Sequence, residues 1–164
     1  MRPVHRCLLQ HGEAIQRRGA ERAEDAEGGD DEFTRQVISG AIAVHRVLGC
    51  GLLESAYSAC LEWELTRRGF RIRRQVRLPV RYGDIELDCA YRIDMLVDGR
   101  LVLELKAVES ILPIHKAQLL SYLRLTGLPM GLLINFHSEV LSRGVTRVIN
   151  SPPSASSAIS APPR

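Results

Sequence analysis

The sequence lacks long apolar runs, and this absence restricts the kind of protein that it encodes. Nowhere in its 164 residues is there a stretch near the roughly 20 apolar residues that span a bilayer. The first ten residues also lack the sustained apolar segment of a signal peptide. We therefore expect a cytoplasmic protein with no membrane partner. No internal repeat is visible.

Paired cysteines are absent as well. The four cysteines, Cys7, Cys50, Cys60 and Cys89, show no C-x-x-C spacing and have no group of histidines beside them, which argues against a zinc site. A hydrophobic content of 45% supplies an ordinary core, so a disulfide framework is not expected. We interpret Cys60 and Cys89 as small buried apolar residues.

Charge is unevenly distributed along the chain. Residues 1–32 carry a net charge of −3, whereas residues 33–164 carry +6. A basic folded part suits a polyanionic partner such as nucleic acid. Residues 1–31, rich in Glu, Arg, Gly and Ala, predict a disordered or frayed extension. Residues 151–164 predict a disordered Ser/Pro/Ala-rich tail, which leaves one domain over residues 32–150.

The hydrophobic pattern of this domain predicts a mixed sheet with helices on its faces. Apolar residues at three- and four-residue spacing predict helices, and alternating or continuous apolar residues predict strands. The expected helices cover residues 33–48, 54–68 and 115–125, and the expected strands cover residues 71–82, 85–97, 101–108, 131–136 and 145–149. The order α-α-β-β-β-α-β-β belongs to the α/β class, in its α+β mixed-sheet form. The third and fourth strands are expected to be central and the fifth to lie at an edge.

Two carboxylates and a lysine surround one predicted hairpin. Asp94 lies ten residues before Glu104, and Lys106 follows Glu104 inside an apolar run. Burying such groups in a strand costs several kcal/mol unless they are paired or bind a cation. The simplest use of two carboxylates beside a lysine is to hold a hard divalent cation and act on phosphate.

The geometry of these groups depends on the turn signal at Asp98-Gly99. A two-residue loop would point Asp94 and Glu104 to opposite faces of the sheet. A three-residue loop, or a bulge near Asp94, would place the two carboxylates across from each other with Lys106 on the same face. The chemistry requires a departure from the tightest turn, and this is our prediction.

On a shared face, Asp94 and Glu104 would supply oxygen ligands to Mg²⁺ or Mn²⁺. Lys106 would orient the nucleophile or stabilise charge on the phosphorus, while Leu105 points into the core. An alternative interpretation is that Glu104 and Lys106 form a solvated ion pair on a half-exposed strand.

Several motifs together resemble one nuclease family. They are Gly51, Glu54 and Tyr57 in a Gly-x-x-Glu-x-x-Tyr pattern, Tyr91-Arg-Ile-Asp94, Glu104-Leu-Lys106-Ala-Val, His115, Gln118 to Tyr122, and Gly131-Leu-Leu-Ile-Asn135-Phe136. Over residues 32–150 the sequence resembles the PD-(D/E)xK nuclease superfamily and, within it, the small bacterial GxxExxY proteins. Each motif is weak alone, but together, in this order and at compatible spacing, they form a strong signal.

The resemblance implies a restriction-endonuclease-like core with the metal site at the hairpin. It implies that Glu54 joins Asp94 and Glu104 as a metal ligand. Relatives of the RecB type can carry a four-cysteine iron–sulfur cluster. No cysteine follows Cys89, so that cofactor is not expected here.

The helix after the hairpin adds two further candidates. Gln118 and Tyr122 resemble the Gln-x-x-x-Tyr element of RecB-type nuclease domains, and their spacing puts them on one helix face. Gln118 would act in catalysis by binding a phosphate or a metal-bound water. Tyr122 would stack on the nucleic acid or contact its backbone. A surface amide beside a half-buried tyrosine is the alternative interpretation.

Basic and aromatic residues outside these motifs have two possible roles each. Seven arginines fall between residues 67 and 81, and Arg71, Arg73 and Arg77 are the expected phosphate contacts among them. A solvated sheet face is the alternative. His115 is a candidate phosphate contact, with a helix-start role as the alternative.

Four other residues are assigned from their local pattern. His45 lies on an apolar stripe and is expected to be a core histidine with its hydrogen bonds satisfied. Tyr57 and Trp63 are expected to pack. Asn135 either ends a strand or lines the site.

Two functions follow from these residues. The first is a metal-dependent nuclease that hydrolyses phosphodiester bonds in DNA or RNA with little sequence specificity of its own. The second is a catalytically inactive nucleic-acid-binding or adaptor module on the same fold. A third interpretation is a protein-interaction domain whose arginines meet an acidic partner. The presence of every expected site residue favours the nuclease, and the sequence does not indicate an oligomeric state.

Overall fold

The computed structural model describes residues 29–87 and 91–151. The predicted N-terminal extension up to residue 28 and the predicted tail from residue 152 lie outside the described residues, as do Cys7 and Cys89. No helix within the described ranges combines the length and the apolar composition needed to cross a membrane.

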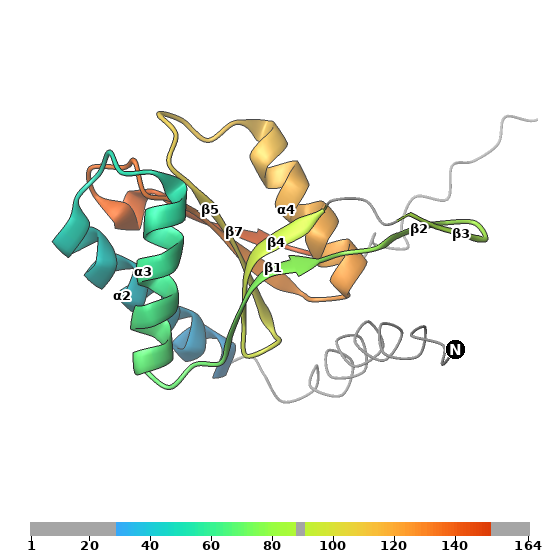
Figure 1. Cartoon of the computed structure of the whole chain (residues 1–164), viewed down its shortest axis with the longest axis horizontal. Coiled ribbons are helices and arrows are strands. Elements are labelled where there is room, and N and C mark those ends of the chain that lie inside the picture. Colours follow the sequence, from blue (N-terminus) through green and yellow to red (C-terminus); the bar gives the residue numbers. More distant parts are fainter. Residues whose placement is uncertain (1–28, 88–90, 152–164) are drawn as a thin grey trace, which may run out of the picture.

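A five-stranded mixed sheet forms the centre of the fold, with helices on both of its faces (Figure 1). The helices are α2 (Gly29–Leu48), α3 (Glu54–Arg67) and α4 (Pro113–Thr126). The sheet strands are β1 (Ile72–Arg77), β4 (Arg92–Val97), β5 (Leu101–Lys106), β6 (Met130–Asn135) and β7 (Val145–Ile149), in the order β1-β4-β5-β6-β7. Only the β5–β6 pair is parallel. The predicted fold class, the central strands β5 and β6 and the edge strand β7 are confirmed.

Each face of the sheet has its own hydrophobic core. One core packs α2 and α3 against the sheet through residues such as Val37, Leu61 and Leu103. The other packs α4 against the opposite face through residues such as Leu119, Leu123 and Val102. Leu103 and Val102 are consecutive residues of β5, so the two cores follow the side-chain alternation of a strand that is buried on both faces. Burial on both faces explains why the sequence of β5 is a nearly continuous apolar run.

Two predicted strands are each divided in the structure. Residues 71–82 form β1 and the separate β2 (Val80–Tyr82), and residues 85–97 contain β3 (Ile85–Leu87) and β4. β2 and β3 pair only with each other, as a small hairpin that extends away from the main sheet (Figure 1). The prediction of one strand over residues 71–82 was wrong because Pro79 has no N–H group with which to continue a sheet ladder. The prediction of one strand over residues 85–97 was wrong because β3 and β4 belong to different sheets. The helix predicted from residue 33 begins earlier, at Gly29.

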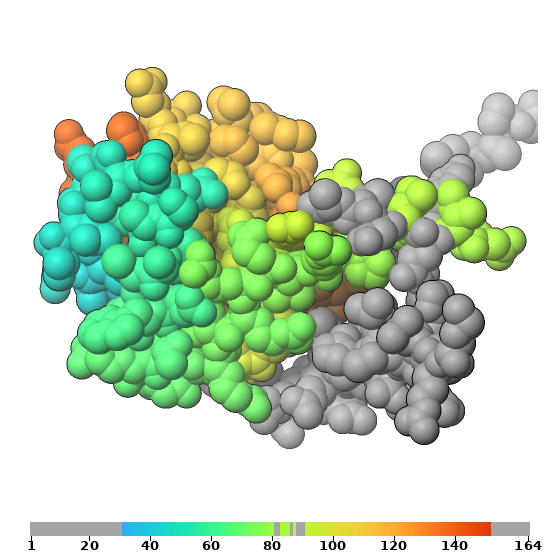
Figure 2. All heavy atoms as spheres, viewed as in Figure 1, coloured from blue at the N-terminus to red at the C-terminus, as the bar shows by residue number. Residues whose placement is uncertain are grey.

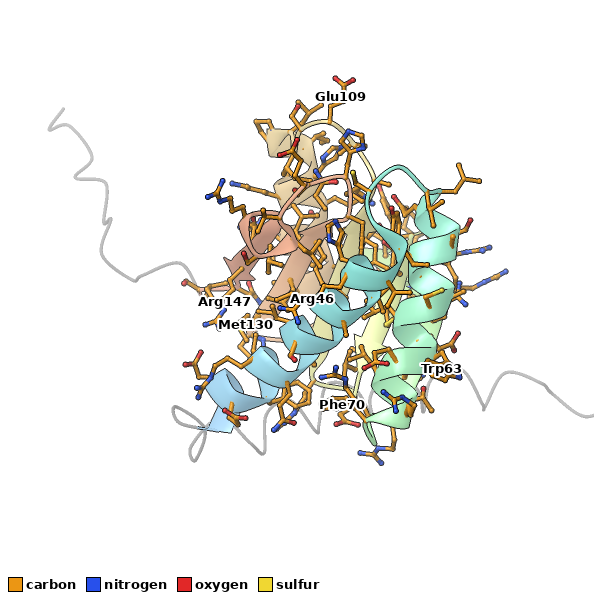
Figure 3. The ribbon with its side chains drawn as sticks, turned by 90° about the vertical axis from the view of Figure 1, so that its left-hand side faces the viewer. Arg46, Trp63, Phe70, Glu109, Met130 and Arg147 are labelled. Carbon is orange, nitrogen blue, oxygen red and sulfur yellow. The ribbon has the colours of Figure 1, made fainter. Side chains whose placement is uncertain are left out.

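Trp63 is the clearest error among the predicted packing residues. Its side chain is 65% exposed on the outer side of α3, as Figure 3 shows, and the guanidinium of Arg67 lies 5.3 Å from its ring. Helical periodicity explains this position, because the buried side of α3 is occupied by Tyr57, Leu61 and Leu65. Tyr57 is fully buried, as predicted. His45 is buried, at 9% exposure, but its Nε2 has no hydrogen-bond partner among the described residues, so the prediction of a satisfied core histidine is only partly confirmed.

The β4–β5 hairpin has the wider turn that the chemistry requires. Val97 pairs with Leu101, so Asp98, Gly99 and Arg100 form a three-residue loop. Asp98 and Gly99 both adopt positive φ angles, of 51° and 73°. Asp and Gly tolerate this conformation best, which explains the turn signal in the sequence.

Gly144 closes the connection between β6 and β7 and has no room for a side chain. A Cβ atom there would lie 2.6 Å from the main-chain oxygen of Asn135 and against the side chain of Ser138. Gly144→Ala is expected to lower the free energy of unfolding by about 2 to 3 kcal/mol, because a fixed main-chain atom blocks the methyl group. Urea denaturation measures this loss, with the exposed neighbour Ser142→Ala as control. Equal stability of the two variants would contradict the expectation.

Candidate active site

Asp94 lies where the ladder between β4 and β5 stops. The antiparallel pairs run from Val97–Leu101 to Met95–Leu103, and the same register brings Asp94 level with Glu104. In place of a further strand–strand bond, the main-chain N–H of Leu105 donates to Oδ2 of Asp94 at 2.9 Å. The two carboxylates therefore lie across from each other, and the strands begin to separate at that level.

Glu104 and Lys106 form a close, buried ion pair. Nζ of Lys106 lies 2.5 Å from Oε1 of Glu104, and their side chains are 15% and 2% exposed. The alternative of a solvated pair on a half-exposed strand is therefore wrong. The other carboxylate oxygen, Oε2 of Glu104, is buried and has no hydrogen-bond partner among the described residues. A buried carboxylate oxygen without a partner is costly, and a bound cation would offset that cost.

Burial and mutual charge interactions shift the pKa values of Glu104 and Lys106. Burial raises the pKa of Glu104 to about 7, and the negative charge of Asp94 adds to this effect, although Lys106 opposes it. Burial by itself would lower the pKa of Lys106, but its hydrogen bond to Glu104 and the three nearby carboxylates raise it. Lys106 therefore stays an ammonium group, and the cluster holds an excess of carboxylates.

Glu54 reaches the same cluster from the first turn of α3. Burial raises the pKa of this half-buried carboxyl group, and the charge of Asp94 contributes to the rise while Lys106 opposes it. Its position depends on Tyr57, whose hydroxyl donates to the oxygen of Gly49 at 2.8 Å and accepts the N–H of Leu52 at 3.0 Å. These two bonds fold the α2–α3 loop, in which Gly51 has a φ of 102°. The Gly-x-x-Glu-x-x-Tyr pattern thus builds the loop that presents its own glutamate.

The Tyr57 ring also connects this loop to the end of β5. It stacks on Phe136 with ring centroids 4.5 Å apart. The main-chain N–H of Phe136 donates to the oxygen of Lys106 at 2.7 Å. The Tyr57–Phe136 stack therefore links the loop that presents Glu54 to the strand end that carries Lys106.

Gln118 and Tyr122 lie on α4 beside the cluster, as the sequence predicts, but the tyrosine is deeply buried. Nε2 of Gln118 donates to the Tyr122 hydroxyl at 2.7 Å. Burial raises the pKa of Tyr122, and the charges of Glu104 and Asp94 add to the rise. Tyr122 is only 3% exposed, so the expected stacking of its ring on a base does not fit the structure. Its hydroxyl and the Gln118 amide are the groups that face the cluster.

The other predicted contacts are distributed around the site. Arg73 and Arg77 are exposed on β1, and Arg71, which precedes that strand, is exposed and paired with Asp98 at 3.5 Å. His115 begins α4, and its Nδ1 accepts the N–H of Leu112 at 3.2 Å, which is the helix-start role.

Asn135 is a strand-end residue that fastens the loop after Lys106. Its side-chain amide donates to the oxygen of Val108 at 2.7 Å, and its side-chain oxygen accepts the Val108 N–H at 3.1 Å. The choice that the sequence left open is thereby settled. The arrangement holds the segment that leads from β5 towards α4.

One neighbour of Asp94 is not indicated by the sequence. Gln75, on β1, donates from Nε2 to Oδ1 of Asp94 at 3.5 Å. Its φ angle is 49°, which is unusual for a residue inside a strand. The sequence shows only a polar residue in an alternating pattern, and no signal there distinguishes Gln75 from the arginines beside it.

The donor set fits a hard divalent cation held by two carboxylates. The described residues contain no group of three or more His, Cys, Asp or Glu side chains close enough to hold one metal ion. Mg²⁺, however, keeps several waters and is usually bound through one or two carboxylates. Asp94 and Glu104 meet that requirement, since Oε2 of Glu104 has no other partner within the described part of the chain. Glu54 remains a predicted ligand of the same cation.

Comparison with known proteins agrees with this geometry. The family model described as the PD-(D/E)XK nuclease superfamily matches residues 31–148. Members of this superfamily generally use divalent metal ions. No curated protein and no solved structure matches the chain.

Proposed function

Because the chain belongs to the PD-(D/E)XK nuclease superfamily, we propose that it is a metal-dependent nuclease that hydrolyses phosphodiester bonds in DNA or RNA. The observation that carries this proposal is the buried Glu104–Lys106 ion pair level with Asp94, in which Oε2 of Glu104 has no hydrogen-bond partner among the described residues. Gly51, Glu54 and Tyr57 support the finer assignment to the GxxExxY proteins. The proposed cation is Mg²⁺ or Mn²⁺.

Each residue of the cluster has a distinct task in this proposal. Asp94 and Glu104 hold the cation, with Glu54 as the third predicted ligand. When bound, the cation supplies Lewis-acid activation and neutralises charge on the phosphate. Lys106 remains protonated and donates to a phosphate oxygen, which stabilises the negative charge that develops in the transition state.

The α4 residues and the exposed basic residues complete the proposed substrate contacts. Gln118 and the hydroxyl of Tyr122 offer hydrogen bonds to a phosphate at the edge of the cluster. Arg73 and Arg77 lie on β1 and Arg71 immediately precedes it. β1 borders α3 on the face shown in Figure 2. Exposed guanidinium groups there suit a nucleic-acid backbone. His115 is the remaining predicted contact.

A cleavage assay tests the proposal directly. End-labelled single- and double-stranded DNA and RNA are incubated with the protein and Mg²⁺ or Mn²⁺, with EDTA as the metal-free reference. We expect cleavage that requires the metal and is lost in Asp94→Asn, because one of the two carboxylate ligands becomes a neutral amide. Asp84→Asn is the matched control, since Asp84 is exposed in the β2–β3 hairpin.

The outcomes of this assay separate the two candidate functions. Metal-dependent cleavage that survives in Asp84→Asn and disappears in Asp94→Asn supports the nuclease. Salt-sensitive binding of nucleic acid, without cleavage in any metal and without an effect of Asp94→Asn, would support the inactive binding module instead. That second result would overturn the proposed activity.

A further inference from the structure

Gln75 has a backbone conformation that ordinary strand residues avoid. Its φ angle of 49° lies in the left-handed region, where a residue with a side chain is strained. It lies inside the six-residue strand β1, and not in a turn. Strain of this kind persists where the surrounding structure imposes it, and it concentrates at functional sites.

The register of the sheet places this strained residue directly beside Asp94. Pairs on either side, Arg74–Met95 and Val76–Ile93, bring Gln75 level with Asp94 between β1 and β4. The β4–β5 register, continued one residue past its last pair, likewise brings Asp94 level with Glu104. Gln75, Asp94 and Glu104 therefore form one row across three adjacent strands.

At Gln75 the alternation of side chains along β1 is interrupted, so that the apolar residues on either side of it point to opposite faces of the sheet. Ile72 packs against the core under α2 and α3, whereas Val76, four residues later, packs in the core under α4. In a regular strand, residues separated by four share a face. β4 changes face at the same level, since Met95 belongs to the first core and Ile93 to the second. The irregularity therefore spans both strands at the row that contains Asp94.

Both oxygens of the Asp94 carboxylate are held as a result. The Leu105 N–H donates to Oδ2 at 2.9 Å, and the exposed Gln75 side chain donates a longer, weaker hydrogen bond to Oδ1 at 3.5 Å. Donors on opposite oxygens favour one orientation of a carboxylate and leave one lone-pair direction free on each oxygen. Hydrogen bonds to a ligating carboxylate set its orientation towards a metal.

We propose that Gln75 is a positioning residue whose strained backbone serves to orient the Asp94 carboxylate towards the divalent cation. This inference rests on the proposed function, because it assumes that Asp94 is a metal ligand. It assigns a role to a residue that neither the sequence motifs nor the family resemblance indicates. Gln75 itself acts through Asp94 and is not a ligand.

Two substitutions separate the backbone of Gln75 from its amide. Gln75→Gly removes both the strain and the amide, so we expect a melting temperature equal to or above that of the unmodified protein. Gln75→Met keeps the side-chain length and the strain but removes the amide. Both variants are expected to weaken Mn²⁺ binding about tenfold, which is the usual effect of losing a group that orients a metal ligand.

Isothermal titration with Mn²⁺ gives the dissociation constant, and thermal unfolding without metal gives the stability. Asp98→Gly is the matched control, because Asp98 has a similar φ of 51° but lies in the hairpin loop. We expect it to leave the Mn²⁺ dissociation constant unchanged.

Three results would count against the inference in different ways. Wild-type Mn²⁺ affinity in both position-75 variants would overturn it and leave the proposed function intact. A lowered melting temperature in Gln75→Gly with unchanged Mn²⁺ affinity would also overturn it, since the residue would then be purely structural. Absence of Mn²⁺ binding by the unmodified protein would overturn the proposed function as well.

Discussion

Replacing Lys106 with methionine is expected to lower the rate of phosphodiester cleavage about 10²- to 10³-fold, which is the typical cost of removing one group that stabilises transition-state charge. The methionine side chain retains most of the volume but cannot donate a hydrogen bond or carry charge. Because the ammonium group acts mainly on charge that develops during the reaction, kcat should fall much more than KM changes. Single-turnover kinetics on a labelled oligonucleotide, with saturating Mn²⁺, measures the effect.

The chain offers an unusually direct control for this experiment. Lys106 and Lys116 are its only two lysines. Lys116 lies on the exposed side of α4, so Lys116→Met makes the same chemical change outside the cluster and should cleave at the unmodified rate. A Lys106→Met protein that is folded and cleaves normally would remove Lys106 from the mechanism.

The Glu104→Gln variant is expected to be more stable than the unmodified protein in the absence of metal, and inactive in its presence. The ionised carboxylate of Glu104 is buried beside Asp94 and Glu54, and one of its oxygens has no hydrogen-bond partner in the described residues. A neutral amide removes that repulsion, so the free energy of unfolding at pH 8 should rise by about 1 to 2 kcal/mol. The gain is partly offset because Lys106 loses its closest partner.

Metal should reverse the order of stability between the two proteins. Mn²⁺ stabilises only a folded state that binds it, so the melting temperature of the unmodified protein should increase with Mn²⁺ concentration. Glu104→Gln should show little increase. Glu109→Gln serves as the control, since Glu109 is exposed in the loop that follows β5 (Figure 3). A metal-free Glu104→Gln protein that is clearly less stable would show that the carboxylate is needed for folding itself.

The central strand and the placement of the two carboxylates could be predicted from the sequence, because the local hydrophobic pattern and the requirement of a shared face agree. The apolar run through Leu101 and Leu105 identified a central strand because such runs occur where both faces are buried. The requirement that Asp94 and Glu104 share a face predicted the wider hairpin loop, and the pairing of Val97 with Leu101 confirms it. The need for two carboxylates on one face thus predicted the length of the hairpin loop, which turn propensities alone do not determine.

The remaining features depend on tertiary contacts that no local pattern contains. The alternation around Gln75 continues in the sequence, yet the backbone there changes face, because register with Asp94 and packing under α4 decide the conformation. The depth of Tyr122 likewise depends on how α4 packs against the sheet. Trp63 is exposed because it lies on the side of α3 that faces away from the core, although its residue type suggests burial.

β1 forms one end of the sheet, and this position has a consequence for how the molecules behave towards one another in solution. A strand at the end of a sheet presents unused N–H and C=O groups that a strand of a second molecule can join. The exposed guanidinium groups of Arg73 and Arg77 oppose this pairing by charge repulsion between the two molecules. The irregular backbone at Gln75 also interrupts the regular strand edge that such pairing requires. Neutralising these arginines to probe nucleic-acid contacts would therefore also favour polymerisation through the sheet, whereas lysine substitutions would retain the protection.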